Sequence, residues 1–135
     1  MMTYMKLKAH SKPTDAQLEV LKILWDRGPL TVRQVHEEFL RVKQSQYTST
    51  LKIMQVMTDR GLVARDERER SHVYRPLIRR EDAQQQLASD LMNRVFAGSA
   101  QRLLVSALDA KRASLKEVDE LRDFIEQYRQ RTKKK

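Results

Sequence analysis

The 135-residue sequence contains no cysteine, which excludes disulfide bonds, catalytic thiols and thiolate metal sites. It has only three glycines and three prolines, too few for the many tight turns of an all-β fold. No stretch approaches the roughly 18 apolar residues that a membrane-spanning helix requires. Residues 1–10 also lack the apolar core of a signal peptide. We therefore expect a cytoplasmic, mainly helical protein that does not insert into a membrane.

Motifs for catalysis and metal binding are absent as well. The sequence has no glycine-rich phosphate loop, no His-Glu-x-x-His motif and no Gly-x-Ser-x-Gly motif. Its three histidines, His10, His36 and His72, are scattered, and none has an acidic or histidine partner at a metal-binding spacing. Surface or capping roles are therefore favoured for them. We expect no enzyme activity, no cofactor and no metal site.

Basic residues outnumber acidic ones, 27 to 18, which gives a net charge of +9 and suggests a polyanionic partner such as nucleic acid. The basic excess is similar in residues 1–75 and 76–135. The charge alone therefore does not indicate which half of the chain contacts the partner, and the motifs have to decide.

Two amphipathic helices are predicted near the start of the chain. Thr14 and Gln17 have the spacing of a capping box, and Thr31 and Gln34 repeat it, so helices begin after each threonine. Gly28 suits a left-handed position at the end of the first helix, and the proline that follows it cannot continue that helix. The first helix carries an apolar stripe of Leu18, Leu21, Leu24 and Trp25.

Residues 46–63, QYTSTLKIMQVMTDRGLV, contain β-branched residues that favour a strand. The pattern has the period of a helix, however, because its apolar and polar residues separate onto opposite faces. The apolar face has Thr50, Ile53, Met54 and Met57, and the polar face has Thr48, Lys52, Gln55 and Asp59. We therefore predict a helix that ends before Gly61.

The next segment predicts a β-hairpin. Residues 62–65 and 71–74 are β-prone, a charged tip joins them, and Pro76 follows the second strand. Three short helices followed by a hairpin indicate a winged helix-turn-helix domain over residues 12–78, preceded by an N-terminal extension of residues 1–11.

Three further amphipathic helices are predicted from residue 80 onward, and a basic tail follows at residues 132–135. Helices this short bury their apolar stripes poorly alone, so residues 79–131 are expected to form a helical dimerisation domain. The residues expected in the dimer interface are Leu87, Leu91, Val95, Leu103, Leu104, Leu108, Val118, Leu121, Phe124, Ile125 and Tyr128.

Double-stranded DNA is the expected partner, because the second helix of a helix-turn-helix enters the major groove with its N-terminal residues at the base edges. The alternative for this helix is a polar face that is only solvated, and for the hairpin a salt-bridged loop. The candidate DNA-binding residues are Thr31, Arg33, Tyr47, Thr48, Ser49, Lys52, Gln55, Arg68 and Arg70.

Three stretches are typical of a known family. They are PTDAQLEVLKILWDRGPLTVRQVHEEF, YTSTLKIMQVMTDRGLV and HVYRPLIRRED. Through these stretches, and especially through Trp25, Thr48, Gly61 and the Tyr74-x-Pro76 arrangement, the sequence resembles the penicillinase-repressor family, the BlaI/MecI/CopY group of bacterial regulators. The resemblance covers about residues 12–128. It implies a homodimer that binds a palindromic operator and represses transcription.

The sequence departs from that family in three places. Glu69 replaces a glycine at the wing tip, which leaves open whether the wing contacts DNA. The absence of cysteine excludes the copper-binding cluster of the copper-responsive members. In the β-lactam-responsive members a membrane sensor metalloprotease cuts an Asn-Phe bond in the dimerisation helix. Ser106-Ala107 stands in that region here, so proteolytic release is left open.

Two other functions are consistent with the residues. One is a winged-helix regulator that senses a small molecule directly between its C-terminal helices. The other is a winged-helix interaction adaptor that does not bind DNA and whose basic charge serves solubility. The operator-binding repressor is the leading hypothesis.

Overall fold

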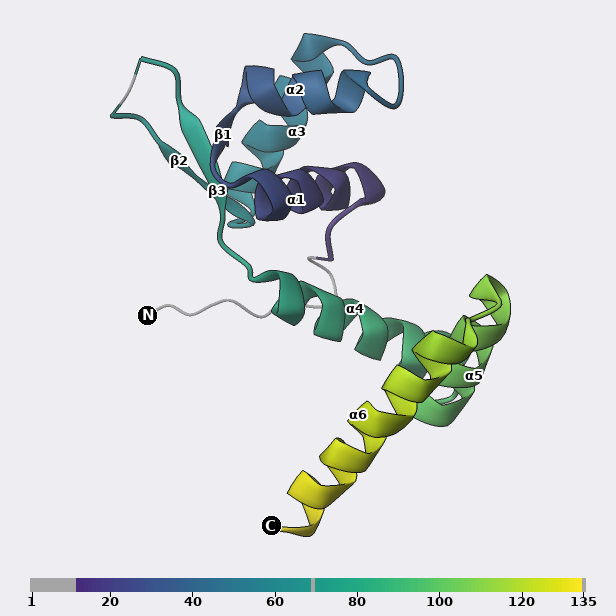
Figure 1. Cartoon of the computed structure of the whole chain (residues 1–135). Coiled ribbons are helices and arrows are strands. Elements are labelled where there is room, and N and C mark those ends of the chain that lie inside the picture. Colours follow the sequence, from purple (N-terminus) through teal and green to yellow (C-terminus); the bar gives the residue numbers. More distant parts are fainter. Residues whose placement is uncertain (1–11, 69, 135) are drawn as a thin grey trace. The chain divides into compact units, whose positions relative to one another are not determined.

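The computed structural model describes residues 12–68 and 70–134 (Figure 1). The described residues form two compact units that divide between Asp90 and Leu91. The helices are α1 (Asp15–Arg27), α2 (Val32–Leu40), α3 (Tyr47–Asp59), α4 (Arg80–Val95), α5 (Ala100–Lys111) and α6 (Leu115–Lys133), and the strands are β1 (Leu30–Thr31), β2 (Val63–Asp66) and β3 (Val73–Pro76). The expected fold class, mainly helical with a small antiparallel sheet, is confirmed.

Both predicted capping boxes are present. The Thr14 hydroxyl accepts from the Gln17 backbone N–H at 3.2 Å, and the Gln17 side chain accepts from the Thr14 N–H at 3.0 Å. Thr31 and Gln34 form the same pair of bonds at the start of α2. Each box satisfies two backbone groups that the first helical turn leaves free, so each helix begins where its sequence predicts.

The end of α1 differs in detail from the prediction. Gly28 has φ +87° and ψ −170°, a positive φ with an extended ψ, where a left-handed helical ψ was expected. The cause is Pro29, because a proline disfavours a helical conformation in the residue before it. The pair therefore ends α1 and directs the chain at once into β1.

The sheet has one more strand than predicted. β1 pairs antiparallel with β3, and the strand order is β1-β3-β2. The hairpin strands also lie one or two residues later than expected, so Pro76 is the last residue of β3 and pairs with Val63. Proline is tolerated there because β1 pairs only with Val73 and Tyr74 and does not reach it.

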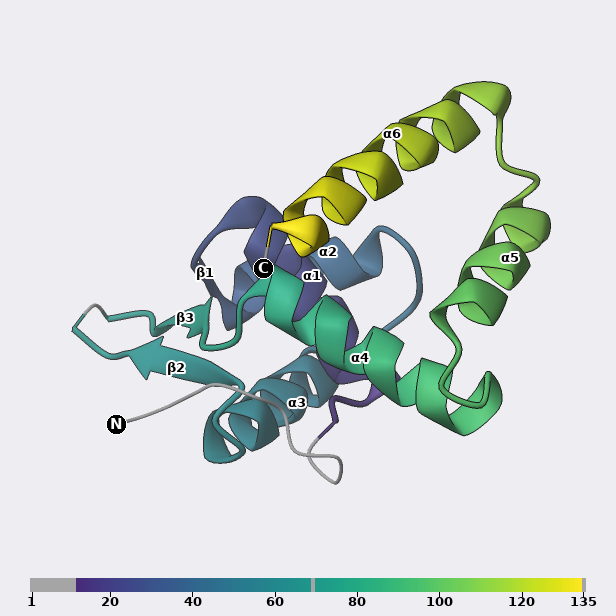
Figure 2. The ribbon, with the colours of Figure 1, turned by 90° about the horizontal axis from the view of Figure 1, so that it is seen from below.

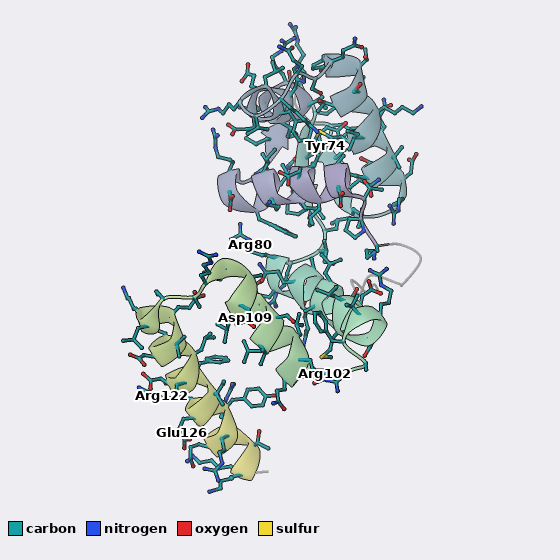
Figure 3. The ribbon with its side chains drawn as sticks, turned by 90° about the vertical axis from the view of Figure 1, so that its right-hand side faces the viewer. Tyr74, Arg80, Arg102, Asp109, Arg122 and Glu126 are labelled. Carbon is teal, nitrogen blue, oxygen red and sulfur yellow. The ribbon has the colours of Figure 1, made fainter. Side chains whose placement is uncertain are left out.

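The core of the first unit lies between α1–α3 and the sheet, with the β2–β3 hairpin extending beyond the helices (Figure 1). Tyr74 of β3 is 2% exposed and reaches into this core (Figure 3). Leu21 and Leu24 of the predicted α1 stripe are buried, whereas Leu18 and Trp25 are half-buried. Fully burying such a side chain contributes about 1.5–3 kcal/mol, so this cluster favours folding of the first unit.

The second unit is built differently. None of the described residues of α5 and α6 is buried. A short connection joins these two helices (Figure 2). α6 ends at Lys133 and so includes the first two of the four residues predicted as a basic tail. The predicted domain boundary at residue 79 lies at the start of α4, and the division between the compact units falls within this helix.

Neither a membrane span nor a metal cluster is found in the described residues. None of their helices combines the length and the apolar character that crossing a bilayer requires. No group of three or more His, Asp or Glu side chains in residues 12–68 and 70–134 is arranged to hold a metal ion.

Candidate nucleic-acid interface

The two faces of α3 separate as its sequence predicts. Thr50, Met54 and Met57 are fully buried, and Ile53 is half-buried against the core. The opposite face is accessible to a partner, and its exposed candidate residues are Tyr47, Thr48, Ser49, Lys52 and Gln55. This polar face carries hydroxyl, ammonium and amide groups, the side-chain chemistry that reads base edges in a major groove.

Four residues join the start of α3 to α2. The Tyr47 ring meets the His36 ring edge-on, with centroids 5.7 Å apart and planes at 83°. The guanidinium of Arg33 lies over the same Tyr47 ring, 5.6 Å from its centroid. Arg33 and Tyr47 are both candidate DNA-binding residues. His36 Nδ1 lies 3.1 Å from the hydroxyl of Thr50. The structure therefore brings Arg33 and Tyr47 together, with Tyr47 supporting the guanidinium.

Thr31 and Arg33, both expected near phosphates, have different surroundings. The hydroxyl and the backbone N–H of Thr31 both belong to the capping box, since the hydroxyl accepts from the Gln34 N–H and the Thr31 N–H donates to the Gln34 side chain. Arg33 is exposed on the first turn of α2. Arg33 is thus the accessible positive charge at this helix start.

The wing is a salt-bridged loop in its described part. Arg68 binds Asp66 with two guanidinium nitrogens, Nε at 3.0 Å and Nη2 at 2.7 Å, and Arg65 pairs with Glu67 at 2.6 Å. The hydrogen bond from the Arg68 side chain lowers the pKa of Asp66 to about 2. Arg70 is exposed. Glu69, the residue that raised the question of wing geometry, lies outside the described residues.

Two residues of this surface were not among the candidates. Val56 is exposed on the same face of α3, one turn after Lys52, and helical spacing alone could have indicated it. A surface or capping role was expected for His36, yet it contacts two residues of α3. No local sequence signal indicates His36, because its partners come from another helix.

The sequence of this chain matches the profile of a known protein family, described as penicillinase repressor, over residues 13–127. The chain belongs to the penicillinase-repressor family. The resemblance of its motifs to that family is thereby confirmed. The match extends over both compact units, and the family consists of transcriptional regulators rather than enzymes.

Two regulators and one solved structure are similar to this chain. The penicillinase repressor of Bacillus licheniformis is 22% identical over 120 residues, which cover 89% of this chain and 94% of that protein. The transcriptional regulator BlaI of Mycobacterium tuberculosis is 32% identical over 110 residues, 80% of this chain and 78% of that protein. A solved structure of a MarR family protein from Bacillus stearothermophilus matches with a TM-score of 0.49 and 21% identity, over 90% of this chain and 76% of that one.

Proposed function

We propose that this member of the penicillinase-repressor family is a homodimeric repressor of transcription that binds a palindromic DNA operator. The observation that carries the proposal is the division of α3 into a buried face, with Thr50, Met54 and Met57, and an accessible polar face. A helix held to the core by one side presents the other side to the major groove. The net charge of +9 supports a polyanionic partner.

Each side chain on the accessible face has a role that fits its chemistry. Lys52 donates to the acceptors of guanine or to a phosphate, and Gln55 pairs with adenine through its amide. The methyl group of Thr48 packs on a thymine methyl, and its hydroxyl binds a base or a phosphate. Arg33, supported by Tyr47, is placed to bind a backbone phosphate beside the groove.

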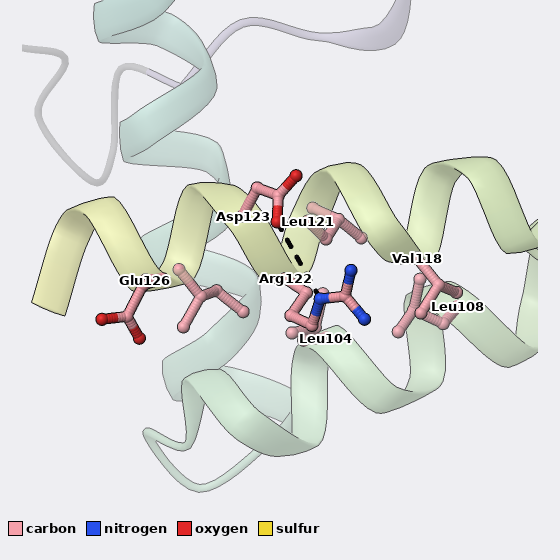
Figure 4. A pocket seen from close by; sticks show the side chains of 8 residues that line it. Leu104, Leu108, Val118, Leu121, Arg122, Asp123 and Glu126 are labelled. Carbon is pink, nitrogen blue, oxygen red and sulfur yellow. Dashed lines mark ion pairs between the residues drawn. The ribbon is translucent and has the colours of Figure 1, made fainter.

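Dimerisation is supported by the apolar surface of the second unit. Phe124 and Tyr128 are both 57% exposed, and Ile125 is 50% exposed. Between α5 and α6 lies an open groove of about 480 Å³ (Figure 4). Its apolar walls are Leu104, Leu108, Val118, Leu121 and Ile125. We assign this surface to a second copy of the chain, since short helices with apolar stripes need a partner to bury them.

The other residues predicted for the dimer interface divide into two groups. Leu91 and Val95 of α4 are exposed and Leu103 of α5 is half-buried, which suits an interface. Leu87 borders a surface cavity of the first unit together with Leu18 and Ala83. We therefore leave Leu87 out of the proposed interface.

Release from the operator by proteolysis is part of the proposal, with a membrane sensor metalloprotease as the protease. The supporting observation is the exposure of Ser106 and Ala107, two consecutive residues of α5. Both lie within a regular helix. Because proteases bind an extended backbone, cleavage there requires local unfolding of α5.

Operator binding is tested by fluorescence anisotropy with palindromes from the promoter of the gene itself. The Thr48→Ala/Lys52→Ala variant should lose about tenfold or more in affinity, because each good base contact is worth about 1–3 kcal/mol. Lys22→Ala is the matched control, since Lys22 is an exposed cation of α1 that pairs with Glu19. Unchanged binding by the double variant, with the dimer intact in sedimentation, would contradict the assignment of α3.

A further inference from the structure

The start of α4 is fastened to the end of α1 by three interactions at one site. The indole N–H of Trp25 donates to the backbone carbonyl of Ile78 at 3.0 Å. The Arg80 guanidinium lies over the Trp25 ring, 5.7 Å from its centroid, and also forms an ion pair with Asp26. Figure 3 shows Arg80 at the start of α4. These partners are more than 50 residues apart in the sequence, so the contacts belong to the tertiary fold.

This site, which we call the α1–α4 clasp (Trp25, Asp26, Ile78 and Arg80), lies at the surface. Trp25 and Arg80 are half-buried, and both border two surface cavities. Ile78 is 4% exposed and belongs to the core, whereas Ala83 is the one buried residue among those described in α4 itself. The other three clasp residues therefore fix the direction of α4 at the surface more than they fill the core.

The direction of α4 matters because the helix crosses the division between the two units. Its first part belongs to the first unit, and it continues without a break to Val95 in the second. A second attachment is the 2.9 Å ion pair between Lys12 and Asp90, the last residue of α4 in the first unit. The clasp at Arg80 and this ion pair therefore hold the two ends of the part of α4 that belongs to the first unit.

We propose that Trp25 and Arg80 are positioning residues that set the half-site spacing of the operator. The inference rests on the proposed function, dimeric operator binding. In such a dimer the two α3 helices must match two half-sites at once, and one base pair shifts a half-site by about 3.4 Å and about a tenth of a helical turn. If the direction in which α4 leaves the DNA-binding unit is fixed, the distance between the two α3 helices of the dimer is restricted. Fewer half-site spacings then allow both α3 helices to bind at once.

Neighbouring arginines offer a matched pair for the test. Arg80 bridges to α1, whereas Arg79, directly before α4, pairs only at 3.8 Å with Glu81 and Asp82 of the first turn of α4. The variants are Arg80→Gln and, from the other side of the clasp, Asp26→Asn. Arg79→Gln is the control for lost charge near the same place. Trp25 is the only tryptophan of the chain, so its fluorescence reports on the clasp itself.

The experiment measures the affinity of the full chain for operators whose half-site spacing differs by one or two base pairs in either direction. For wild type we expect one preferred spacing. For Arg80→Gln, the ratio of affinities between the preferred spacing and the others should fall about fivefold, the effect of losing one surface ion pair and one cation–π contact. Asp26→Asn should show a smaller fall, and Arg79→Gln none. The tryptophan emission of Arg80→Gln should shift to longer wavelength as the indole meets water.

Different failures have different meanings. If Arg80→Gln weakens binding equally at every spacing, or leaves the preference unchanged, the clasp has only a structural role and the inference is wrong. A preference that falls equally in Arg79→Gln would also overturn it, since charge alone would then explain the change. If wild type binds none of the duplexes above random DNA, the proposed function itself fails. Melting temperatures measured in parallel separate these results from loss of folding.

Discussion

His36 of α2 and Thr50 of α3 join the two helices of the proposed DNA-binding motif. His36 Nδ1 lies 3.1 Å from the Thr50 hydroxyl, and the Thr50 side chain is completely buried. A buried hydroxyl needs a hydrogen-bond partner, and α2 provides it. The position of α3 relative to α2 is therefore coupled to this polar contact as well as to the packing around it.

Replacing His36 should destabilise the first unit. In His36→Ala, Thr50 keeps a buried hydroxyl without its partner, which costs about 1–3 kcal/mol. The free energy of unfolding in urea measures this change. His72→Ala is the control, because His72 is exposed near the wing. Adding Thr50→Val to His36→Ala should recover part of the loss, since the valine leaves no hydroxyl unsatisfied. A loss that Thr50→Val deepens would argue against this account.

The pKa of Asp66 should depend on Arg68. In wild type, the hydrogen bond from Arg68 holds the Asp66 pKa at about 2, below its usual 3.8. In Arg68→Ala, we expect the pKa to return toward 3.8, as measured by carboxyl NMR titration. Because the folded-state pKa is lowered, the stability from this pair is present above about pH 4 and lost as the pH falls through about 2. The stability difference between wild type and Arg68→Ala should therefore vanish at the lowest pH.

Arg112 ends α5 in a left-handed conformation, with φ +53° and ψ +63°. Residues other than glycine are strained in this conformation, at a cost of about 1 kcal/mol or more. Arg112→Gly should therefore raise the melting temperature slightly, by relieving a strain that outweighs the greater freedom of glycine in the unfolded chain. Arg129→Gly, in the interior of α6, should lower the melting temperature, because there is no strain to relieve and glycine loses more backbone freedom on folding. Equal losses in both variants would contradict the prediction.

The proposed dimer should depend on the groove between α5 and α6. Ile125→Asp places a charge on its apolar wall, where burial against a second chain leaves that charge unpaired. We expect sedimentation velocity to show monomers at concentrations where wild type is dimeric. Gln127→Asp, at an exposed position two residues further along α6, should stay dimeric. If Ile125→Asp sediments as wild type does, the interface lies elsewhere.

Local signals in the sequence predicted the helices well. The capping boxes at Thr14 and Thr31 mark the starts of α1 and α2, and the helical period of α3 outweighs its β-branched composition. Such signals are short in range and act on neighbouring residues, so they can be read directly. The winged-helix domain and the face of α3 were predictable for this reason.

Features that depend on distant partners were not predictable. β1 is two residues long, too short for a pattern, and exists because β3 pairs with it. His36 finds its role through Thr50, and Trp25 finds its acceptor in Ile78, 53 residues away. A single sequence shows the donors and acceptors but not which of them meet.

The absence of buried residues in the described helices α5 and α6 links the stability of the second unit to the abundance of the protein. If dimerisation supplies the missing core, folding of this unit follows mass action, and its stability rises with the logarithm of the concentration of the chain. When few chains are present, a newly made chain then has a folded first unit and a second unit without a dimer partner, open to proteolysis. Cellular proteases would clear such chains first, which gives the repressor a threshold concentration below which it does not accumulate.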